Sequence, residues 1–250
     1  MGSGSQVGWT DHTINPWWGC QRISTGCDNC YAAAFDKRMG GGYWSDGVTP
    51  GRTKPETWNM ARSYSNYGYH TGTRVRVFAG SMCDIFDNRV PPQWREDFWG
   101  LIKGTPDVDW LLLTRRIGNA AAMLPSDWGG GWGNVWLGVT VANQEEVARD
   151  VGALLRIPAR VHFLSVEPQL EFISLGPDPG DLRGLDWVIN GAESGPAHRP
   201  FDTDWARALR DQCADHGIAY FYKQGVANGK KVELPELDGV IHDAIPQGGI

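Results

Sequence analysis

The sequence lacks the features that mark membrane, secreted and strongly basic proteins. No stretch approaches the roughly 18 consecutive apolar residues of a membrane span, and no apolar run follows Met1 as in a signal peptide. The formal net charge is −6, so the excess of Lys and Arg that grips a nucleic-acid backbone is missing. We therefore expect a cytoplasmic globular protein whose 250 residues form one domain.

Cysteine is scarce, yet three of the five cysteines fall within eleven residues. Six residues separate Cys20 from Cys27 and two separate Cys27 from Cys30, whereas Cys83 and Cys213 stand apart in apolar stretches. An odd count without a signal peptide argues against a disulfide framework and for a thiolate metal site in a reduced compartment. For the two isolated cysteines, a buried and inert thiol is the commoner role.

Two metal centres suit such thiolates. A structural zinc site takes four ligands, normally as two pairs, and the sequence has no second Cys-x-x-Cys or His-x-x-x-His pair. A 4Fe-4S cluster held by only three cysteines leaves one iron open to a small molecule. We therefore favour an open 4Fe-4S cluster on Cys20, Cys27 and Cys30. A zinc site with Cys83 or Cys213 as a distant fourth ligand remains the alternative.

Short apolar runs alternate with helical patterns, which is typical of a parallel sheet covered by helices. The sequence has 13 Trp. We expect these large rings to fill the core of the sheet and favour this role over a surface that stacks bases. We expect strands at 9–15, 74–79, 109–114, 134–141, 160–166, 185–190 and 219–222, and helices at 31–38, 91–102, 118–124, 144–155 and 204–216. Residues 1–5 resemble a cloning remnant. We expect residues 6–228 to form the domain, with a long loop at about 40–73, and residues 229–250 to form a C-terminal tail.

Polar side chains follow six consecutive expected strands. In an α/β barrel the carboxyl ends of all strands open on one face, so these side chains and the cysteine loop would surround one cavity. They are Ser81, Asp84, Thr114, Arg115, Thr140, Asn143, Ser165, Glu167, Asn190, Glu193, Ser194, Lys223 and Gln224.

Several motifs resemble those of a known enzyme class. Asn15-Pro-Trp-Trp-Gly-Cys and Gly26-Cys-Asp-Asn-Cys-Tyr-Ala resemble the cluster loop of radical S-adenosylmethionine (SAM) enzymes, particularly the spore photoproduct lyase-like branch. From Trp9 to about Gln224 the chain resembles a family of phage-encoded, radical-SAM-like proteins of unassigned chemistry. The matching blocks are Gly80-Ser-Met-Cys-Asp-Ile-Phe, Leu112-Leu-Thr-Arg-Arg, Asn134-Val-Trp-Leu-Gly-Val-Thr-Val-Ala-Asn, Phe163-Leu-Ser-Val-Glu-Pro, Trp187-Val-Ile-Asn-Gly-Ala-Glu-Ser-Gly and Phe221-Tyr-Lys-Gln.

The sequence departs from the commonest radical SAM pattern at two places. That pattern is Cys-x-x-x-Cys-x-aromatic-Cys, whereas here the first gap is six residues long and Asn29 precedes the last cysteine, with Tyr31 after it. The usual Gly-Gly-Glu element is replaced by Gly80-Ser81-Met82, so Ser81 or Asp84 would stand in for the missing carboxylate.

The resemblance implies a partial (β/α)6-type TIM barrel and an enzyme that cleaves SAM with a 4Fe-4S cluster. The resulting 5'-deoxyadenosyl radical would abstract a hydrogen atom from a substrate, in an isomerase, lyase or transferase reaction. Residues expected to bind SAM are Tyr31, Gly80, Ser81, Met82, Asp84, Thr114, Thr140, Asn143 and Ser165. Residues expected to bind substrate are Arg115, Glu167, Glu193, Ser194 and Lys223, with Glu167 and Glu193 as catalytic candidates and rim salt bridges as their structural alternative.

Expected partners follow from the same resemblance. They are SAM, an electron donor such as flavodoxin or ferredoxin, and a nucleotide or modified DNA base, as in phage DNA hypermodification within a bacterial host. The alternative is a non-catalytic iron-sulfur or zinc protein that binds nucleic acid or a protein partner.

Overall fold

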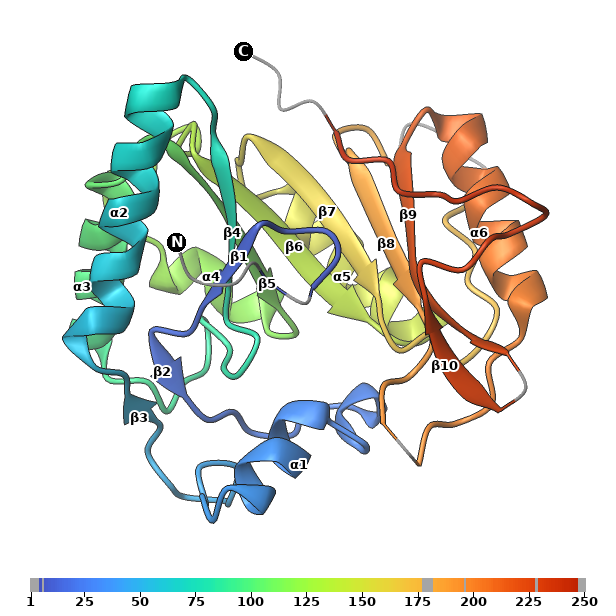
Figure 1. Ribbon diagram of the computed structural model, residues 1–250, viewed down its shortest axis with the longest axis horizontal. Helices are drawn as coiled ribbons and strands as arrows, with labels where there is room; N and C mark the ends of the chain where they lie inside the picture. Colours follow the sequence, from blue (N-terminus) through green and yellow to red (C-terminus); the bar gives the residue numbers. More distant parts are fainter. Residues whose placement is uncertain (1–4, 6, 177–181, 196, 228, 247–250) are drawn as a thin grey trace. The chain divides into compact units, whose positions relative to one another are not determined.

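The protein is an α/β structure built on a mostly parallel sheet (Figure 1). The computed structural model describes residues 5, 7–176, 182–195, 197–227 and 229–246, so only Ser5 of the expected cloning remnant is described. Eight strands pair in the order β1-β4-β5-β6-β7-β8-β9-β10, and β2 pairs with β3. Among the described residues, no helix is long and apolar enough to span a bilayer.

Two compact units make up the chain. Unit 1 comprises Met1–Arg22, Ala32–Leu137 and Pro158–Arg160, and unit 2 comprises Ile23–Tyr31, Gly138–Ile157 and Val161–Ile250. The division falls inside strand β6 (Val135–Val141) and inside the cysteine loop, which leaves Cys20 in unit 1 and places Cys27 and Cys30 in unit 2.

Unit 1 contains the first strands of the sheet. Its strands are β1 (His12–Ile14), β2 (Trp17–Trp18), β3 (Gly51–Arg52), β4 (Val75–Ala79) and β5 (Val108–Thr114). Its helices are α1 (Tyr31–Arg38), of which Tyr31 belongs to unit 2, α2 (Pro55–Thr71), α3 (Pro92–Lys103) and α4 (Ile117–Met123). Strand β4 pairs in parallel with both β1 and β5, with Val77 opposite His12 and Trp110. Strand β5 consists of the buried, largely apolar run VDWLLLT, which is typical of a strand inside a parallel sheet covered on both faces.

The aromatic residues of unit 1 form its core. The ring of Phe98 on α3 meets the rings of Trp17, Trp58 and Trp110 edge-on, with centroids 5.4–6.1 Å apart. Trp17 and Trp110 are fully buried. These tryptophans therefore serve packing, as the sequence favoured.

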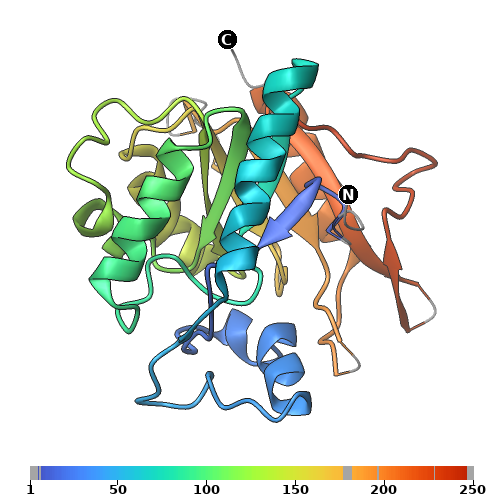
Figure 2. The same cartoon turned by 60° about the vertical axis from the view of Figure 1, so that its left-hand side comes forward.

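Helix α2 corrects one prediction, because residues 55–71 of the expected long loop are helical. Pro55 opens the helix and Gly72, with φ of 68°, ends it. Its buried face is made of Trp58, Ala61, Ser65 and Gly68, which recur at helical spacing. The sequence does not show this period clearly, because three of the four buried residues are small or polar and none is a large aliphatic residue. The buried face lies against β1 and β4 (Figure 2).

Unit 2 continues the sheet with β7 (Val161–Val166), β8 (Trp187–Gly191), β9 (Ala219–Ala227) and β10 (Lys230–Glu233). Helix α5 (Gln144–Leu155) packs on β7, and helix α6 (Thr203–His216) packs on β8 and β9. The 3-10 turn η1 covers Thr25–Cys27. Strand β10 begins the expected tail and pairs antiparallel with β9. The backbone N–H of Ala244 donates to the carbonyl of Tyr220, so the later tail also runs along β9.

Candidate functional site

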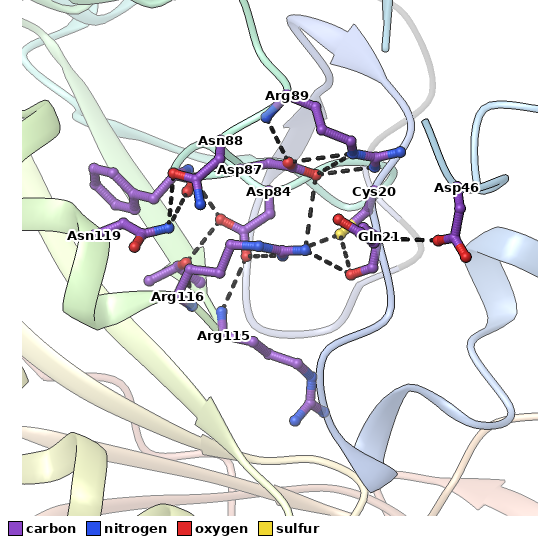
Figure 3. Close-up of polar contacts among 12 residues, drawn as sticks. Cys20, Gln21, Asp46, Asp84, Asp87, Asn88, Arg89, Arg115, Arg116 and Asn119 are labelled. Carbon is purple, nitrogen blue, oxygen red and sulfur yellow. Dashed lines mark hydrogen bonds and ion pairs between the residues drawn. The ribbon is translucent and has the colours of Figure 1, made fainter. Parts of the chain in front are cut away.

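Cys20 lies against a buried arginine in unit 1 (Figure 3). Arg116 Nη1 donates to Cys20 Sγ at 3.3 Å, and Arg116 Nη2 donates to the carbonyl of Gln21 at 2.6 Å. Burial raises the pKa of the Cys20 thiol to about 12, with Asp84 adding to the rise and Arg116 opposing it. The thiol is therefore protonated near neutral pH unless a metal replaces the proton.

Asp84 connects the carboxyl ends of β4 and β5. Its Oδ1 accepts from Thr114 Oγ1 at 2.7 Å and from the N–H of Phe86, and its Oδ2 accepts from the N–H of Arg115 and from Arg116 Nη1, both at 3.1 Å. The sequence proposed Asp84 and Thr114 as SAM contacts. In this structure both carboxylate oxygens accept hydrogen bonds from protein donors, which tie this segment to the end of β5, and the SAM contacts stay a prediction.

The segment that replaces Gly-Gly-Glu is attached to the chain just before Cys20. Asn15 Oδ1 accepts from the N–H of Met82 at 2.8 Å and from Ser81 Oγ at 3.3 Å. The N–H of Gly19 donates to the carbonyl of Met82 at 2.9 Å. Gly80 has φ of 101°, and a Cβ there would lie 3.1 Å from the carbonyl oxygen of Cys83, which explains a glycine at the strand end.

The other two cysteines of the loop share one turn in unit 2. The N–H of Cys27 donates to the carbonyl of Ser24, and the N–H of Cys30 donates to the carbonyl of Cys27 at 3.3 Å. This turn precedes α1, which begins at Tyr31. A three-residue offset in a hydrogen-bonded turn places both thiols on one side of the backbone.

Glu193 holds this cysteine turn. The carboxylate is buried and accepts from Asn29 Nδ2 at 2.9 Å, from the N–H of Arg199 at 2.9 Å and from the Arg199 guanidinium. Arg199 Nη2 in turn donates to the carbonyl of Thr25 at 3.0 Å, and Arg199 pairs with Asp28 at 3.5 Å. Burial alone would raise the pKa of Glu193, but the hydrogen bonds from Arg199 and Asn29 outweigh it and lower that pKa.

A second acid and base meet at the strand ends of unit 2. Lys223 Nζ donates to Glu167 Oε1 at 2.7 Å. Asn190 pairs with Tyr222 and Gly191 with Gln224, so Lys223 is an extra residue in a bulge of β9. A Cβ on Gly191 would lie 3.0 Å from Glu167 Oε1, so the glycine gives that carboxylate its space. Bulges often re-aim a side chain beside an active site.

The remaining predicted residues have mixed surroundings. Ser194 Oγ accepts from Gln224 Nε2 at 2.8 Å, which brings Ser194 beside the strand that carries Lys223. Asn143 caps α5 by accepting from the N–H of Glu146, a structural role. Thr140 and Ser165 are buried, whereas Tyr31 is exposed.

The five cysteines differ in exposure as the sequence predicted. Cys20, Cys27 and Cys30 are free thiols of intermediate exposure, whereas Cys83 and Cys213 are free and buried. Across the described part of the chain, no three His, Cys, Asp or Glu side chains already converge to hold a metal ion. The three-cysteine ligand set therefore stays a prediction, and its basis is the chemistry and spacing of partly exposed thiols.

Sequence reasoning missed Arg116 and Arg199, the two arginines that hold the cysteine loop. It selected Arg115 instead, whose backbone N–H binds Asp84. One signal was available for Arg116. Asp84 and Asp87 are both acidic within a largely apolar segment, and buried carboxylates need a cationic partner.

Of the comparisons with known proteins, the one with solved structures bears on the fold. Residues 4–246 match the model of a family described as "Protein of unknown function (DUF5131)". Among curated proteins, none matches the sequence significantly. Three similar solved structures are of spore photoproduct lyase: a cysteine-to-serine mutant, a complex with the dinucleoside spore photoproduct and a tyrosine-to-phenylalanine mutant. Their TM-scores are 0.50, 0.50 and 0.51, each at 13% identity and covering 84% of this chain.

This likeness confirms the predicted fold class, an α/β fold with a parallel sheet covered by helices, which resembles the fold of spore photoproduct lyase. The chain spans 62% of the length of each of those structures. Nothing in the comparisons supports a phage origin or a role in DNA modification, and both stay predictions.

Proposed function

We propose that this chain, which belongs to the DUF5131 family of proteins of unknown function, is a radical SAM enzyme whose Cys20, Cys27 and Cys30 hold a 4Fe-4S cluster. When bound, such a cluster supplies the electron that cleaves SAM to a hydrogen-abstracting 5'-deoxyadenosyl radical. One observation carries the proposal. In a fold like that of spore photoproduct lyase, the three spaced cysteines are partly exposed free thiols while the two others are buried.

The residues around the cysteines suit such a group. Arg116 presents an N–H to Cys20 Sγ, and hydrogen bonds of this kind support a metal-bound thiolate. Glu193 and Arg199 fix the turn that carries Cys27 and Cys30. Ligands held before the metal arrives lose less conformational freedom when they bind it.

Anaerobic reconstitution with iron and sulfide tests the cluster. The expected result is about four iron per chain and brown absorption, lost in Cys20→Ala, Cys27→Ala and Cys30→Ala. Cys213→Ala is the matched control, because it removes a buried thiol outside the loop and should retain full iron. Stoichiometric zinc without iron uptake would refute the proposal and favour the non-catalytic metal protein.

SAM cleavage tests the activity. The reduced, loaded protein should release 5'-deoxyadenosine slowly without any substrate, because the open iron and not the substrate activates the sulfonium. Liquid chromatography with mass detection measures that release. A fully loaded cluster that binds SAM but never releases deoxyadenosine would contradict an enzymatic role.

For the substrate we propose a nucleotide or a DNA base, bound by Glu167 and Lys223. Support comes from the similar lyase structure that is complexed with a dinucleoside photoproduct, and from the bulge that re-aims Lys223 beside Glu167. A primary ammonium group suits a phosphate, and a carboxylate accepts hydrogen bonds from base or sugar donors. Ser194 and Gln224 add a hydroxyl and an amide next to this pair.

Two conservative variants separate substrate binding from SAM cleavage. Glu167→Gln and Lys223→Met should leave iron content and uncoupled deoxyadenosine release unchanged while abolishing stimulation by substrate. A panel of nucleosides, nucleotides, short DNA, peptides and amino acids identifies the stimulating class. Stimulation by peptides or amino acids alone would overturn the nucleic-acid assignment.

A further inference from the structure

A cluster of charged side chains that contacts Cys20 contains one more guanidinium group than carboxylates. We define the arginine-aspartate cluster as Asp84, Asp87, Arg89, Arg95 and Arg116, all from unit 1. Arg116 pairs with Asp84 at 3.1 Å and with Asp87 at 3.7 Å, and Arg89 pairs with Asp87 at 3.0 Å. Within the described residues, the hydrogen bonds of Arg95 go to backbone carbonyls, those of Ile85 and Asp87, each at 3.0 Å.

The charges of this cluster are therefore three guanidinium groups against two carboxylates. Arg95, Asp84, Asp87 and Arg116 are buried, so solvent does little to screen the excess. An uncompensated buried charge is costly, and a nearby anion relieves that cost. Outside the cluster, Arg116 faces the sulfur of Cys20, 3.3 Å from Nη1, and the carbonyl oxygen of Gln21, 2.6 Å from Nη2.

Arg116 also grips the backbone next to this sulfur. One terminal nitrogen of its guanidinium binds Cys20 Sγ and Asp84 Oδ2, and the other binds the carbonyl oxygen of Gln21 (Figure 3). Its planar fork thus ties the segment 20–21 to the end of β5. A lysine, with one nitrogen, does not reproduce this bridge.

We propose that Arg116 is a positioning residue that fixes Cys20 before any cluster is present and then stabilises the ligated thiolate through its charge and N–H···S hydrogen bond. This inference rests on the proposed function, since it assigns the thiolate to a bound cluster. Hydrogen bonds to ligating sulfurs and the local net charge are among the factors that set the reduction potential of an iron-sulfur centre. Arg116 therefore tunes the ease of reduction as well as the geometry.

The first test uses the protein without a cluster. Hydrogen exchange of backbone amides in the peptide 17–22 is compared between wild type, Arg116→Gln and Arg89→Gln. Arg89 is the matched control, because it belongs to the same cluster and its guanidinium binds Asp87 and the carbonyls of Ser45 and Val48. We expect at least about tenfold faster exchange in Arg116→Gln and wild-type exchange in Arg89→Gln. The peptide 24–30 serves as an internal reference.

The second test uses the loaded protein and measures the midpoint potential by EPR-monitored redox titration. Arg116→Gln should shift the one-electron equilibrium toward the oxidised cluster about tenfold, which is a potential lower by about 59 mV. A smaller shift is expected for Arg89→Gln, which removes a charge without removing the donor to sulfur. If Arg116→Gln fails to fold, the double variant Arg116→Gln with Asp84→Asn removes the charge pair together.

The outcomes separate this inference from the proposed function. Wild-type exchange and wild-type potential in a loaded Arg116→Gln protein would overturn the inference while leaving the enzyme assignment intact. A wild-type protein that takes up no iron would refute the proposed function instead. Faster exchange confined to Arg116→Gln, together with a larger fall in potential than in Arg89→Gln, would support the positioning role.

Discussion

Replacing Glu193 with glutamine should weaken the turn that carries Cys27 and Cys30. The Glu193 carboxylate binds Asn29 and Arg199, which hold that turn, whereas the Glu167 carboxylate binds Lys223. We therefore expect Glu193→Gln to loosen the turn and Glu167→Gln to spare it. The sequence places both carboxylates with the substrate residues, so this pair of variants decides between the two roles.

The size of the effect follows from the hydrogen bonds that the substitution removes. The Glu193 side chain is 4% exposed, and an amide replaces one of its acceptor oxygens with a donor that faces Arg199. Buried hydrogen bonds to charged groups contribute about 1.5–3 kcal/mol each, and Arg199 is 30% exposed, so we expect a total of about 2 kcal/mol. For a chain of this size that lowers the melting temperature by about 4–8 °C. Glu167→Gln keeps an acceptor for Lys223 and should cost about 1 kcal/mol or less.

The assay combines melting of the cluster-free protein with iron content after reconstitution. Glu193→Gln should melt about 4–8 °C lower, at about 2–4 °C per kcal/mol, and retain less iron than wild type, because Asn29 lies between two ligands of the proposed cluster. Glu167→Gln should match wild type in iron. A Glu193→Gln protein with normal melting and iron but no product formation would refute this reasoning and return Glu193 to the substrate.

Three further predictions concern stability. Lowering the pH should remove the contribution of Glu193 to stability, because folding lowers the pKa of its carboxyl group. The difference in unfolding free energy between wild type and Glu193→Gln should be complete above the unfolded pKa of about 4.3 and should decrease below it. Urea titrations at several pH values measure this difference. Gly138→Ala should destabilise by about 1–3 kcal/mol in chemical denaturation, because its Cβ would lie 2.5 Å from the Phe163 ring; unchanged stability would mean that the ring moves freely. Cys213→Ala should cost about 1 kcal/mol in the same assay through packing alone, and a loss of iron would contradict its structural role.

Local patterns in the sequence predict the elements that depend on local signals. Helix α5 begins after the cap at Asn143 and spans Gln144–Leu155 as expected, because the cap and the apolar period coincide. Helix α2 was missed because its buried face uses Ser65 and Gly68, residues that are rare on apolar faces.

The residues of the candidate site are also predictable only where local signals mark them, and the contacts between residues far apart in the sequence are not. The sequence predicts Asp84, Glu167 and Lys223 as site residues because each follows the end of an apolar run, where an α/β barrel opens its site. It did not reveal that Asp84 pairs with Arg116, 32 residues away, since such pairing arises from the tertiary fold and leaves no periodic trace. The Glu167 and Lys223 pair, 56 residues apart, depends in addition on a bulge in β9.

The two anchors of the cysteine loop also impose an order on its assembly during translation. Cys20 meets its guanidinium partner 96 residues later in the chain, whereas Thr25 meets Arg199 only 174 residues later. At about 5–20 residues per second, about 4–17 s pass between the synthesis of residue 116 and that of residue 199. A nascent chain in this interval has its first ligand tethered and its other two without their anchor. We expect iron and sulfide delivery to follow the synthesis of Arg199, because only then can all three ligands have their anchors.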